Sequence, residues 1–331
     1  MDKRVILMIL DGWGIATDKE VSAVDAAATP FIDSLYKKYS HSTLEASGIA
    51  VGLPKGQMGN SEVGHMNLGA GRVVYQDLVK INIATEEGSL GEEKTLVEAF
   101  EYAKENQRAI HFIGLVSDGG VHAHLDHLKG LIQAAHKHRC SQVFVHAFTD
   151  GRDCDPKSGL GFINDLSAYL KNHVGSIASI VGRYYAMDRD KRWERIKVAY
   201  DTLVKGIGTK TTDVTAAIEA AYAKDVTDEF MPPTIATDAS GEPLAKIEEG
   251  DVVMCFNFRT DRGREITEAL TQRDFPNEDM YKMSLHYLTM TSYDDTFQNV
   301  KAIFRKDNLY NTLGEVLEKA GKNQIRFAET E

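Results

Sequence analysis

The sequence predicts an α/β protein in which a split outer domain carries an inserted α/β domain. Short apolar runs alternate with amphipathic stretches, which is the pattern of a parallel sheet with helical crossovers. The chain has 331 residues, more than one ordinary hydrophobic core accommodates. A glycine-rich segment at 49–71 and a polar segment at 294–306 interrupt the alternation, so the chain contains more than one folding unit.

Six segments have the apolar character of strands buried on both faces. They are residues 5–10, 109–115, 142–148, 176–181, 251–256 and 284–289. Helices are expected at 29–38, 94–105, 125–138 and 191–204. The first of these has Thr29 in position to cap it and Pro30 in its first turn. Residues 73–83 should link the glycine-rich segment to a helix.

The tail contains one further helix, at 309–319, and one strand, at 324–328. Together with the first segment they would bury too little surface to form an independent sheet domain. We therefore expect residues 1–76 and 309–331 to be two parts of an incomplete outer domain. Residues 77–294 would form the inserted domain, and residues 295–308 would be a linker.

Composition excludes several classes of function. The net charge of −11 argues against nucleic acid, which is bound mainly by neutralising phosphates with Lys and Arg. No apolar run reaches the length of a membrane span, and 5–10 is too short for a signal peptide. Three widely separated cysteines favour a reducing compartment, so we expect a cytoplasmic protein.

Two residues of the outer segment could take part in chemistry. Asp11 follows the first expected strand and could ligate a hard cation, or it could merely cap the next turn. Ser61 lies in the glycine-rich segment without a His-Asp partner, so a metal is the better activator if it is a nucleophile. The alternative is an ordinary Asn-Ser turn.

Four expected strands of the inserted domain are each followed by Arg or His. One of His122 and His124 is expected to be only a surface residue at a helix start. The Arg next to Asp153 could bind the carboxylate of a hydroxy-acid, and Asp153 could bind the hydroxyls of the same molecule. The cationic residues are His122, Arg152, Arg183, Arg189, Arg259 and Arg262. Because carboxyl ends of parallel strands meet at one edge, these residues predict a crevice for a phosphorylated or carboxylated small molecule.

These motifs, in this order, resemble those of 2,3-bisphosphoglycerate-independent phosphoglycerate mutases of the alkaline-phosphatase superfamily. The resemblance covers the whole chain, and its most specific parts surround Ser61 and residues 183–189. The matching segments are Leu10-Asp11-Gly12-Trp13-Gly14, Gly59-Asn60-Ser61-Glu62-Val63-Gly64-His65, Ser117-Asp118-Gly119-Gly120-Val121-His122, Asp150-Gly151-Arg152-Asp153, Gly182-Arg183-Tyr184-Tyr185-Ala186-Met187-Asp188-Arg189 and Phe258-Arg259-Thr260-Asp261-Arg262. The outer domain is then expected to be alkaline-phosphatase-like.

The resemblance implies a glycolytic and gluconeogenic isomerase that interconverts 3-phosphoglycerate and 2-phosphoglycerate. Ser61 would be the nucleophile that forms a phosphoserine intermediate. Asp11 and Ser61 would ligate one of two Mn²⁺ ions. The substrate would be held by His122, Arg152, Asp153, Arg183, Arg189, Arg259 and Arg262. The intact enzyme is expected to be a monomer without nucleic-acid or membrane partners.

The sequence departs from the family after residues 328–331. Family members continue with a lysine and with the Asp and His residues that complete both metal sites. The chain therefore resembles a C-terminally truncated member, and self-association is conceivable for such a fragment. The alternatives are a non-catalytic phosphoglycerate-binding fragment or another superfamily phosphomutase or phosphodiesterase. The latter would lack the clusters at 183–185 and 259–262.

The 331-residue chain is predicted not to interconvert the two phosphoglycerates, because two protein ligands are too few to fix two catalytic metals. A coupled assay with excess Mn²⁺ measures this directly. Turnover that survives purification from the host mutase and disappears in Ser61→Ala would disprove the prediction.

Overall fold

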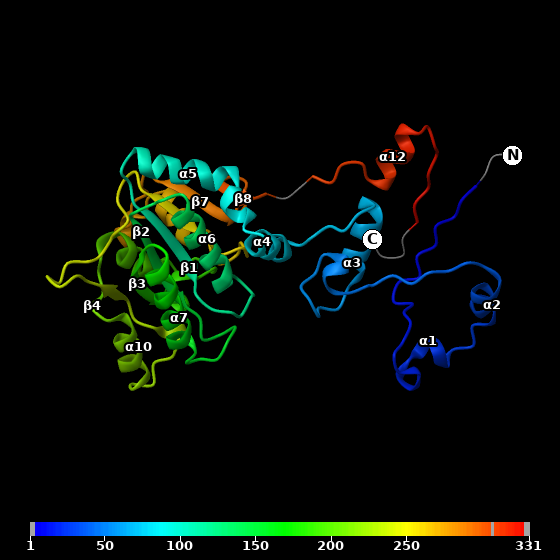
Figure 1. Ribbon diagram of the computed structural model, residues 1–331, viewed down its shortest axis with the longest axis horizontal. Coiled ribbons are helices and arrows are strands. Elements are labelled where there is room, and N and C mark those ends of the chain that lie inside the picture. Colours follow the sequence, from blue (N-terminus) through cyan, green and yellow to red (C-terminus); the bar gives the residue numbers. More distant parts are fainter. Residues whose placement is uncertain (1–3, 306–307, 328–331) are drawn as a thin grey trace. The chain divides into compact units, whose positions relative to one another are not determined.

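The computed structural model describes residues 4–305 and 308–327 (Figure 1). The chain separates into two compact units. One comprises Met1–Val79 together with Asn308–Glu331, and the other comprises Lys80–Asp307. We call them the outer unit and the sheet unit and describe each by itself.

The sheet unit is built on a sheet of eight strands among the described residues, in the order β4-β5-β3-β2-β1-β6-β7-β8. All neighbouring pairs are parallel except β3 and β5, which are antiparallel. The strands are β1 (Ile110–Leu115), β2 (Val143–Thr149), β3 (Ser176–Gly182), β4 (Thr209–Thr211), β5 (Thr234–Ala236), β6 (Val252–Cys255), β7 (His286–Thr291) and β8 (Val300–Phe304). The predicted α/β class is confirmed.

The helices follow the strands as crossovers. In the sheet unit they are α5 (Lys94–Glu105), α6 (Leu125–Lys137), α7 (Gly159–Asn172), α8 (Arg183–Ala186), α9 (Trp193–Tyr200), α10 (Val214–Tyr222) and α11 (Arg264–Thr271). Helix α4 (Asp77–Glu86) spans the division between the units. Those of the outer unit are α1 (Ala23–Ala26), α2 (Pro30–Lys38), α3 (Ser61–Ala70) and α12 (Leu313–Lys319). None in the described part of the chain is long and apolar enough to cross a membrane.

The order of the strands defines a switch point between β1 and β6. The chain moves outward from β1 to β2 and β3, returns to place β6 on the other side of β1, and then moves outward to β7. Because parallel crossovers are right-handed, the two series put their helices on opposite faces. Figure 1 shows α6 and α7 beside β1, β2 and β3, and α11 follows β6 in the other series.

The core lies between the sheet and these helices. The side chains of Phe112, Phe148, Phe256 and Tyr287 come from four different strands and are fully buried. Burial on both faces explains why the central strands are almost continuously apolar in sequence. For the same reason the five expected strands between residues 109 and 289 are found within two residues of their expected positions.

Three strands of this sheet were not expected. Strands β4 and β5 have three residues each, too few to produce a periodic pattern. Strand β8 falls inside residues 295–308, which the sequence suggested to be a linker. It pairs with β7 alone at the edge of the sheet. An edge strand tolerates exposed polar side chains such as Lys301, and the sequence of this segment can therefore be polar.

In the outer unit, the glycine-rich segment at 49–71 contains a helix. Helix α3 begins at Ser61, where the Asn60 side chain accepts a hydrogen bond from Val63 N–H at 3.0 Å. It ends at Gly71, which has the left-handed φ of 66° common after helices. The glycines at 64 and 69 lie inside the helix and weaken its sequence signal. The cap and the terminal glycine were the signals that could have revealed it.

The two strands expected in the outer unit are absent from its described residues. Residues 5–10 have no regular structure, and the Val5 side chain is 89% exposed. Residues 324–327 are also irregular, with Phe327 93% exposed, and Ala328 lies outside the described residues. A strand needs a neighbour that satisfies its backbone groups. The described part of this unit offers only an isolated bridge between Ser47 and Met58.

This difference predicts unequal protection from hydrogen exchange. Amides of β1, β2 and β3 should exchange slower than those of α2 and α12 by on the order of a thousandfold or more, because they open only with the core. Mass spectrometry of peptides from the dilute chain measures both regions in one sample. Equal protection would show that the outer unit has a core of comparable stability.

Candidate active site

The outer unit brings together the two residues that its sequence singled out. The Ser61 hydroxyl, at the first position of α3, donates a hydrogen bond to the carboxylate of Asp11. His65 lies one turn later, and its Nδ1 is 2.8 Å from the Ser61 carbonyl oxygen. Both Ser61 and Asp11 are exposed. Two oxygen donors side by side suit a hard cation. No cluster of three or more His, Cys, Asp or Glu able to hold a metal occurs in residues 4–305 and 308–327.

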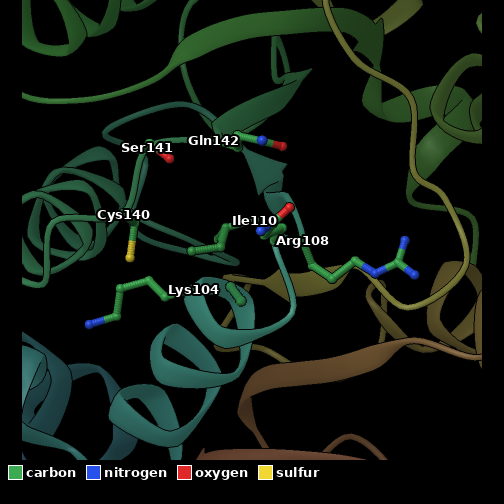
Figure 2. Close-up of a pocket in the computed structure, with 8 residues that line it drawn as sticks. Lys104, Arg108, Ile110, Cys140, Ser141 and Gln142 are labelled. Atoms are coloured by element: carbon green, nitrogen blue, oxygen red, sulfur yellow. The ribbon is translucent and has the colours of Figure 1, made fainter.

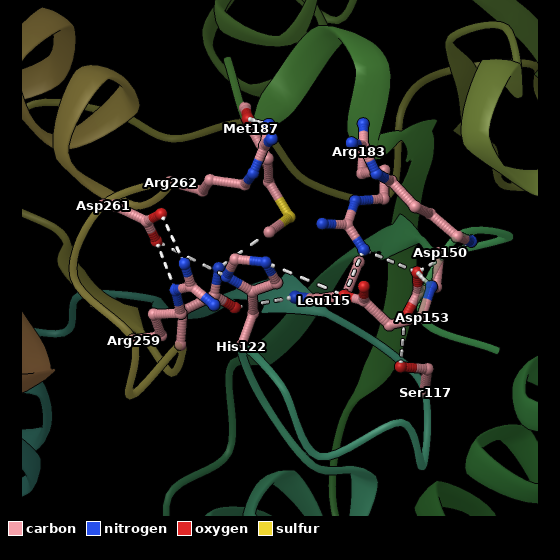
Figure 3. A network of polar contacts seen from close by, with 12 residues as sticks. Leu115, Ser117, His122, Asp150, Asp153, Arg183, Met187, Arg259, Asp261 and Arg262 are labelled. Atoms are coloured by element: carbon pink, nitrogen blue, oxygen red, sulfur yellow. Dashed lines mark hydrogen bonds and ion pairs between the residues drawn. The ribbon is translucent and has the colours of Figure 1, made fainter. Parts of the chain in front are cut away.

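The sheet unit gathers its cationic residues at the carboxyl ends of β1, β2, β3 and β6. Figure 3 shows three of them, Arg183, Arg259 and Arg262, around His122. The site lies at the switch point between β1 and β6, where crevices form in open α/β sheets because the connections diverge. Asn257 joins the two strand ends, since its side-chain oxygen accepts a hydrogen bond from Leu115 N–H at 3.0 Å.

Asp150 is the buried centre of one half of the crevice. It follows β2 and accepts hydrogen bonds from the Ser117 hydroxyl at 2.6 Å and from Arg152 and Asp153 N–H at 3.1 and 3.0 Å. Burial by itself would raise the pKa of Asp150, but these bonds and the Arg183 guanidinium lower it below its ordinary value. The carboxylate therefore stays ionised at neutral pH and orders the loop after β2.

Arg183 is held between two carboxylates. It begins α8 directly after β3 and is 3% exposed. Its Nη1 lies 2.6 Å from Asp150 and 2.5 Å from Asp153. The preceding Gly182 is required here, because a Cβ at that position would lie 2.4 Å from the Glu229 carbonyl oxygen. A buried guanidinium needs such partners, and they fix its position before any ligand arrives.

His122 occupies the middle of the crevice. Its Nε2 is 3.7 Å from Asp153 and its Nδ1 is 3.7 Å from Asp261, too far for hydrogen bonds. Nδ1 is buried without a hydrogen-bond partner. Burial, followed by the nearby Arg183, lowers the pKa of His122 to about 4. The imidazole is thus neutral at pH 7, and its Nδ1 lies beside Asp261 without a hydrogen bond. His124, by contrast, caps α6 by accepting from Asp126 N–H.

Asp261 organises the other half of the crevice. It accepts two hydrogen bonds from Arg259, at 3.0 and 3.1 Å, and one from Arg189 at 3.0 Å. Arg262 donates to the Met187 carbonyl oxygen at 2.9 Å. Burial, together with the positive charges of Arg183, Arg189 and Arg152, lowers the pKa of Arg262 below its ordinary value. A group under this repulsion gains from a bound anion.

Next to this network lies a cavity of about 200 Å³. Its lining is almost entirely charged: Arg152, Arg183, Tyr184, Asp188, Arg189, Asp190, Arg192, Arg195, Glu229 and Arg262. Arg152 is the least constrained of its cations, with an ion pair of 3.5 Å to Glu229 and a side chain that is 56% exposed. The cavity has the size and charge expected for a small anion.

A second hollow, of about 240 Å³, lies at the amino-terminal ends of β1 and β2, away from the strand ends that carry the crevice (Figure 2). Lys104, Arg108 and Cys140 line it together with Ser141 and Gln142. Burial raises the pKa of the Cys140 thiol to about 11, so it is not a nucleophile at neutral pH. Nothing here matches the converging charges of the crevice, which we take as the candidate site.

The structure therefore groups the proposed residues in two places. Asp11 and Ser61 meet in the outer unit, and the other seven surround the crevice of the sheet unit. Sequence reasoning did not single out Asp150 or Asp261, which hold arginines in place, or Ser117, which donates a hydrogen bond to Asp150. Each lies within a quoted motif, so an acidic residue near a strand-end Arg was the available signal.

Comparison with known proteins identifies a family. The family model "BPG-independent PGAM N-terminus" matches residues 81–295. A protein of Flavobacterium johnsoniae named 2,3-bisphosphoglycerate-independent phosphoglycerate mutase is 62% identical over the whole chain, which spans 66% of that protein. One of the same name from Parabacteroides distasonis is 54% identical, with 65% of its length spanned. The chain thus spans about two thirds of the length of these curated relatives.

A solved structure supports the fold. It is Leishmania mexicana phosphoglycerate mutase, crystallised at low cobalt concentration, and it is similar with a TM-score of 0.68 and 35% identity. The match covers 90% of this chain and 56% of that one. The family model alone spans more than half of the chain. The chain therefore belongs to the 2,3-bisphosphoglycerate-independent phosphoglycerate mutase family.

Proposed function

We propose that the intact enzyme represented by this chain interconverts 3-phosphoglycerate and 2-phosphoglycerate, an isomerisation of glycolysis and gluconeogenesis. The observation that carries the proposal is the crevice around His122, where arginines that follow several strands lie around a neutral histidine with an unpartnered nitrogen. The ligand proposed for it is a small molecule with one phosphate and one carboxylate. Both groups suit guanidinium, which binds planar and tetrahedral oxyanions through paired donors.

The binding roles follow from the contacts. Arg152, Arg189, Arg259 and Arg262 keep donors available at or near the cavity and would hold the two anionic groups. Asp153 would accept from a hydroxyl of the glycerate, and neutral His122 would donate one hydrogen bond. Arg183 keeps Asp150 and Asp153 in place and adds positive potential. All seven proposed substrate-binding residues belong to the sheet unit.

Ser61 is the proposed phosphoryl acceptor. Its Oγ would attack phosphorus as the bond to the 3-oxygen of the glycerate breaks, and the serine proton would pass to that departing oxygen, which becomes the 3-hydroxyl. After the glycerate reorients, its 2-hydroxyl oxygen would take the phosphoryl group back, which restores the serine. The hydrogen bond to Asp11 orients the hydroxyl. Asp11 and Ser61 would ligate Mn²⁺, and a bound divalent cation lowers the pKa of the serine and offsets phosphoryl charge.

For the 331-residue chain itself, we propose substrate binding rather than turnover. Its described residues supply all seven substrate ligands but only two of the metal donors. We place the protein in the cytoplasm, in keeping with its free cysteines at 140, 154 and 255. For the intact enzyme we propose a monomer.

Arg152→Ala should weaken binding of 3-phosphoglycerate by about tenfold or more, because it removes a charge-assisted hydrogen bond from a pre-formed site. The unaltered chain should bind with a Kd between about 1 μM and 1 mM, and more weakly in added salt. Isothermal titration calorimetry measures both. Arg152 is half exposed, so its removal should leave the fold intact.

Arg273→Ala is the matched control. Arg273 pairs with Glu268 at 2.6 Å and takes no part in the crevice. Its variant should bind as the unaltered chain does. If both variants bind equally well, Arg152 is not a ligand, and if the unaltered chain does not bind, the proposed function is wrong.

The role of Ser61 is best tested in a protein extended by the C-terminal third of one of the relatives. Peptide mass spectrometry during turnover should find a phosphoryl group on Ser61. Ser61→Ala should abolish the label and lower kcat by several orders of magnitude. Ser34→Ala, on the exposed α2, should change neither. A fully active Ser61→Ala variant would show that the phosphoryl group takes another route.

A further inference from the structure

Glu265 is a buried carboxyl group for which the proposed mechanism has no role. It lies in the first turn of α11, three residues after Arg262, and is 5% exposed. Its Oε1 accepts a hydrogen bond from Lys191 N–H at 2.8 Å. Its Oε2 is buried without a hydrogen-bond partner. A buried oxygen without a hydrogen bond lowers the stability of the fold, so its presence needs a physical explanation.

The hydrogen bond of Glu265 joins two ligand-bearing segments. Lys191 follows Arg189 by two residues and has a left-handed φ of 60°, a strained value for a residue with a side chain. Arg262 makes the parallel connection from the other segment, by donating to the Met187 carbonyl oxygen at 2.9 Å. Residues 187–191 are thus hydrogen-bonded at both ends to residues 262–265, in and just before the first turn of α11.

A second buried carboxylate, Asp188, binds the N–H groups on either side of Lys191. Asp188, itself 3% exposed, accepts hydrogen bonds from Asp190 and Arg192 N–H and from the Arg192 side chain. Burial, and then the charge of Asp188, raises the pKa of Glu265 from 4.5 to about 7. Glu268 on the same helix adds to this effect, whereas Arg192 and Arg195 pair with Asp188. A proton on Oε2 would give that oxygen a hydrogen bond to donate.

We propose that Glu265 is a positioning residue whose protonated carboxyl fastens the Arg189 segment to α11 and so sets the spacing of Arg189 and Arg262 around the bound phosphoglycerate. This inference rests on the proposed function. When the proton is lost, two like charges face each other between Asp188 and Glu265. The repulsion pushes residues 188–191 away from α11, and the two arginines lose their common geometry.

The sign of the pH effect follows from the raised pKa. The folded chain binds this proton more tightly than the unfolded chain, so the protonated state stabilises the fastened form. That contribution is lost progressively as pH rises from 4.5 through about 7. The ligand's own phosphate also titrates near neutral pH, so the effect must be measured against a variant without the titrating group.

Glu265→Gln is that variant, because its amide keeps an acceptor for Lys191 N–H and a donor for Asp188 at every pH. Binding of 3-phosphoglycerate is measured by calorimetry at about pH 6 and about pH 8. At the lower pH Glu265→Gln should bind as the unaltered chain does. At the higher pH it should bind about three- to tenfold more tightly. Glu265→Ala, which loses the connection, should bind about three- to tenfold more weakly at both.

Two further variants distinguish a failure of this inference from a failure of the proposed function. Glu219→Gln, on the exposed face of α10, should follow the unaltered chain at both pH values. Arg152→Ala tests the site itself. If Arg152→Ala weakens binding while Glu265→Gln follows the unaltered chain at both pH values, the site stands and the role of Glu265 is refuted. If the unaltered chain does not bind 3-phosphoglycerate at either pH, the proposed function fails first. Should Glu265→Ala not fold, the Gln comparison still decides.

Discussion

The return of the chain from β5 to β6, alongside β1, is the constraint on which the site depends. It separates two outward series of strands and leaves a crevice where their connections diverge. Hydrogen bonds to backbone groups fix the crevice walls. The Asn257 side chain accepts from Leu115 N–H, and the Phe258 and Arg259 N–H groups both donate to the His122 carbonyl oxygen. Side chains that follow four different strands therefore face one small volume.

Ion pairs then determine the positions of those side chains. A buried guanidinium without a partner would cost several kcal/mol, so the fold supplies carboxylates to the deepest arginine. Asp150 and Asp153 hold Arg183, and Asp261 holds Arg189 and Arg259. Asp150 is held in turn by the Arg152 and Asp153 N–H groups and by the Ser117 hydroxyl. Surplus positive charge remains on the Arg152 and Arg262 side of the cavity, where an anion gains most.

The two units contribute differently. The sheet unit has a continuous apolar core, and ion pairs within the unit hold its site residues. The outer unit has helices with caps but no strand ladder among its described residues, and apolar side chains of residues 5–8 are exposed. Its Ser61 and Asp11 are nonetheless in contact, because the cap at Asn60 fixes where α3 begins and hence where the Ser61 hydroxyl lies.

The sequence by itself determined the α/β class, the five central strands and the side chains that follow them, because strands buried on both faces must be apolar and their ends carry motifs. It also indicated Ser61 and Asp11. Only the tertiary structure revealed β8 at the sheet edge, where an open side relaxes the apolar requirement. It also placed β6 beside β1, and assigned Asp150, Asp261 and Glu265 their partners. The reason is that a carboxylate's role depends on which distant guanidinium or N–H group the fold brings to it, and residue spacing along the chain does not record that pairing.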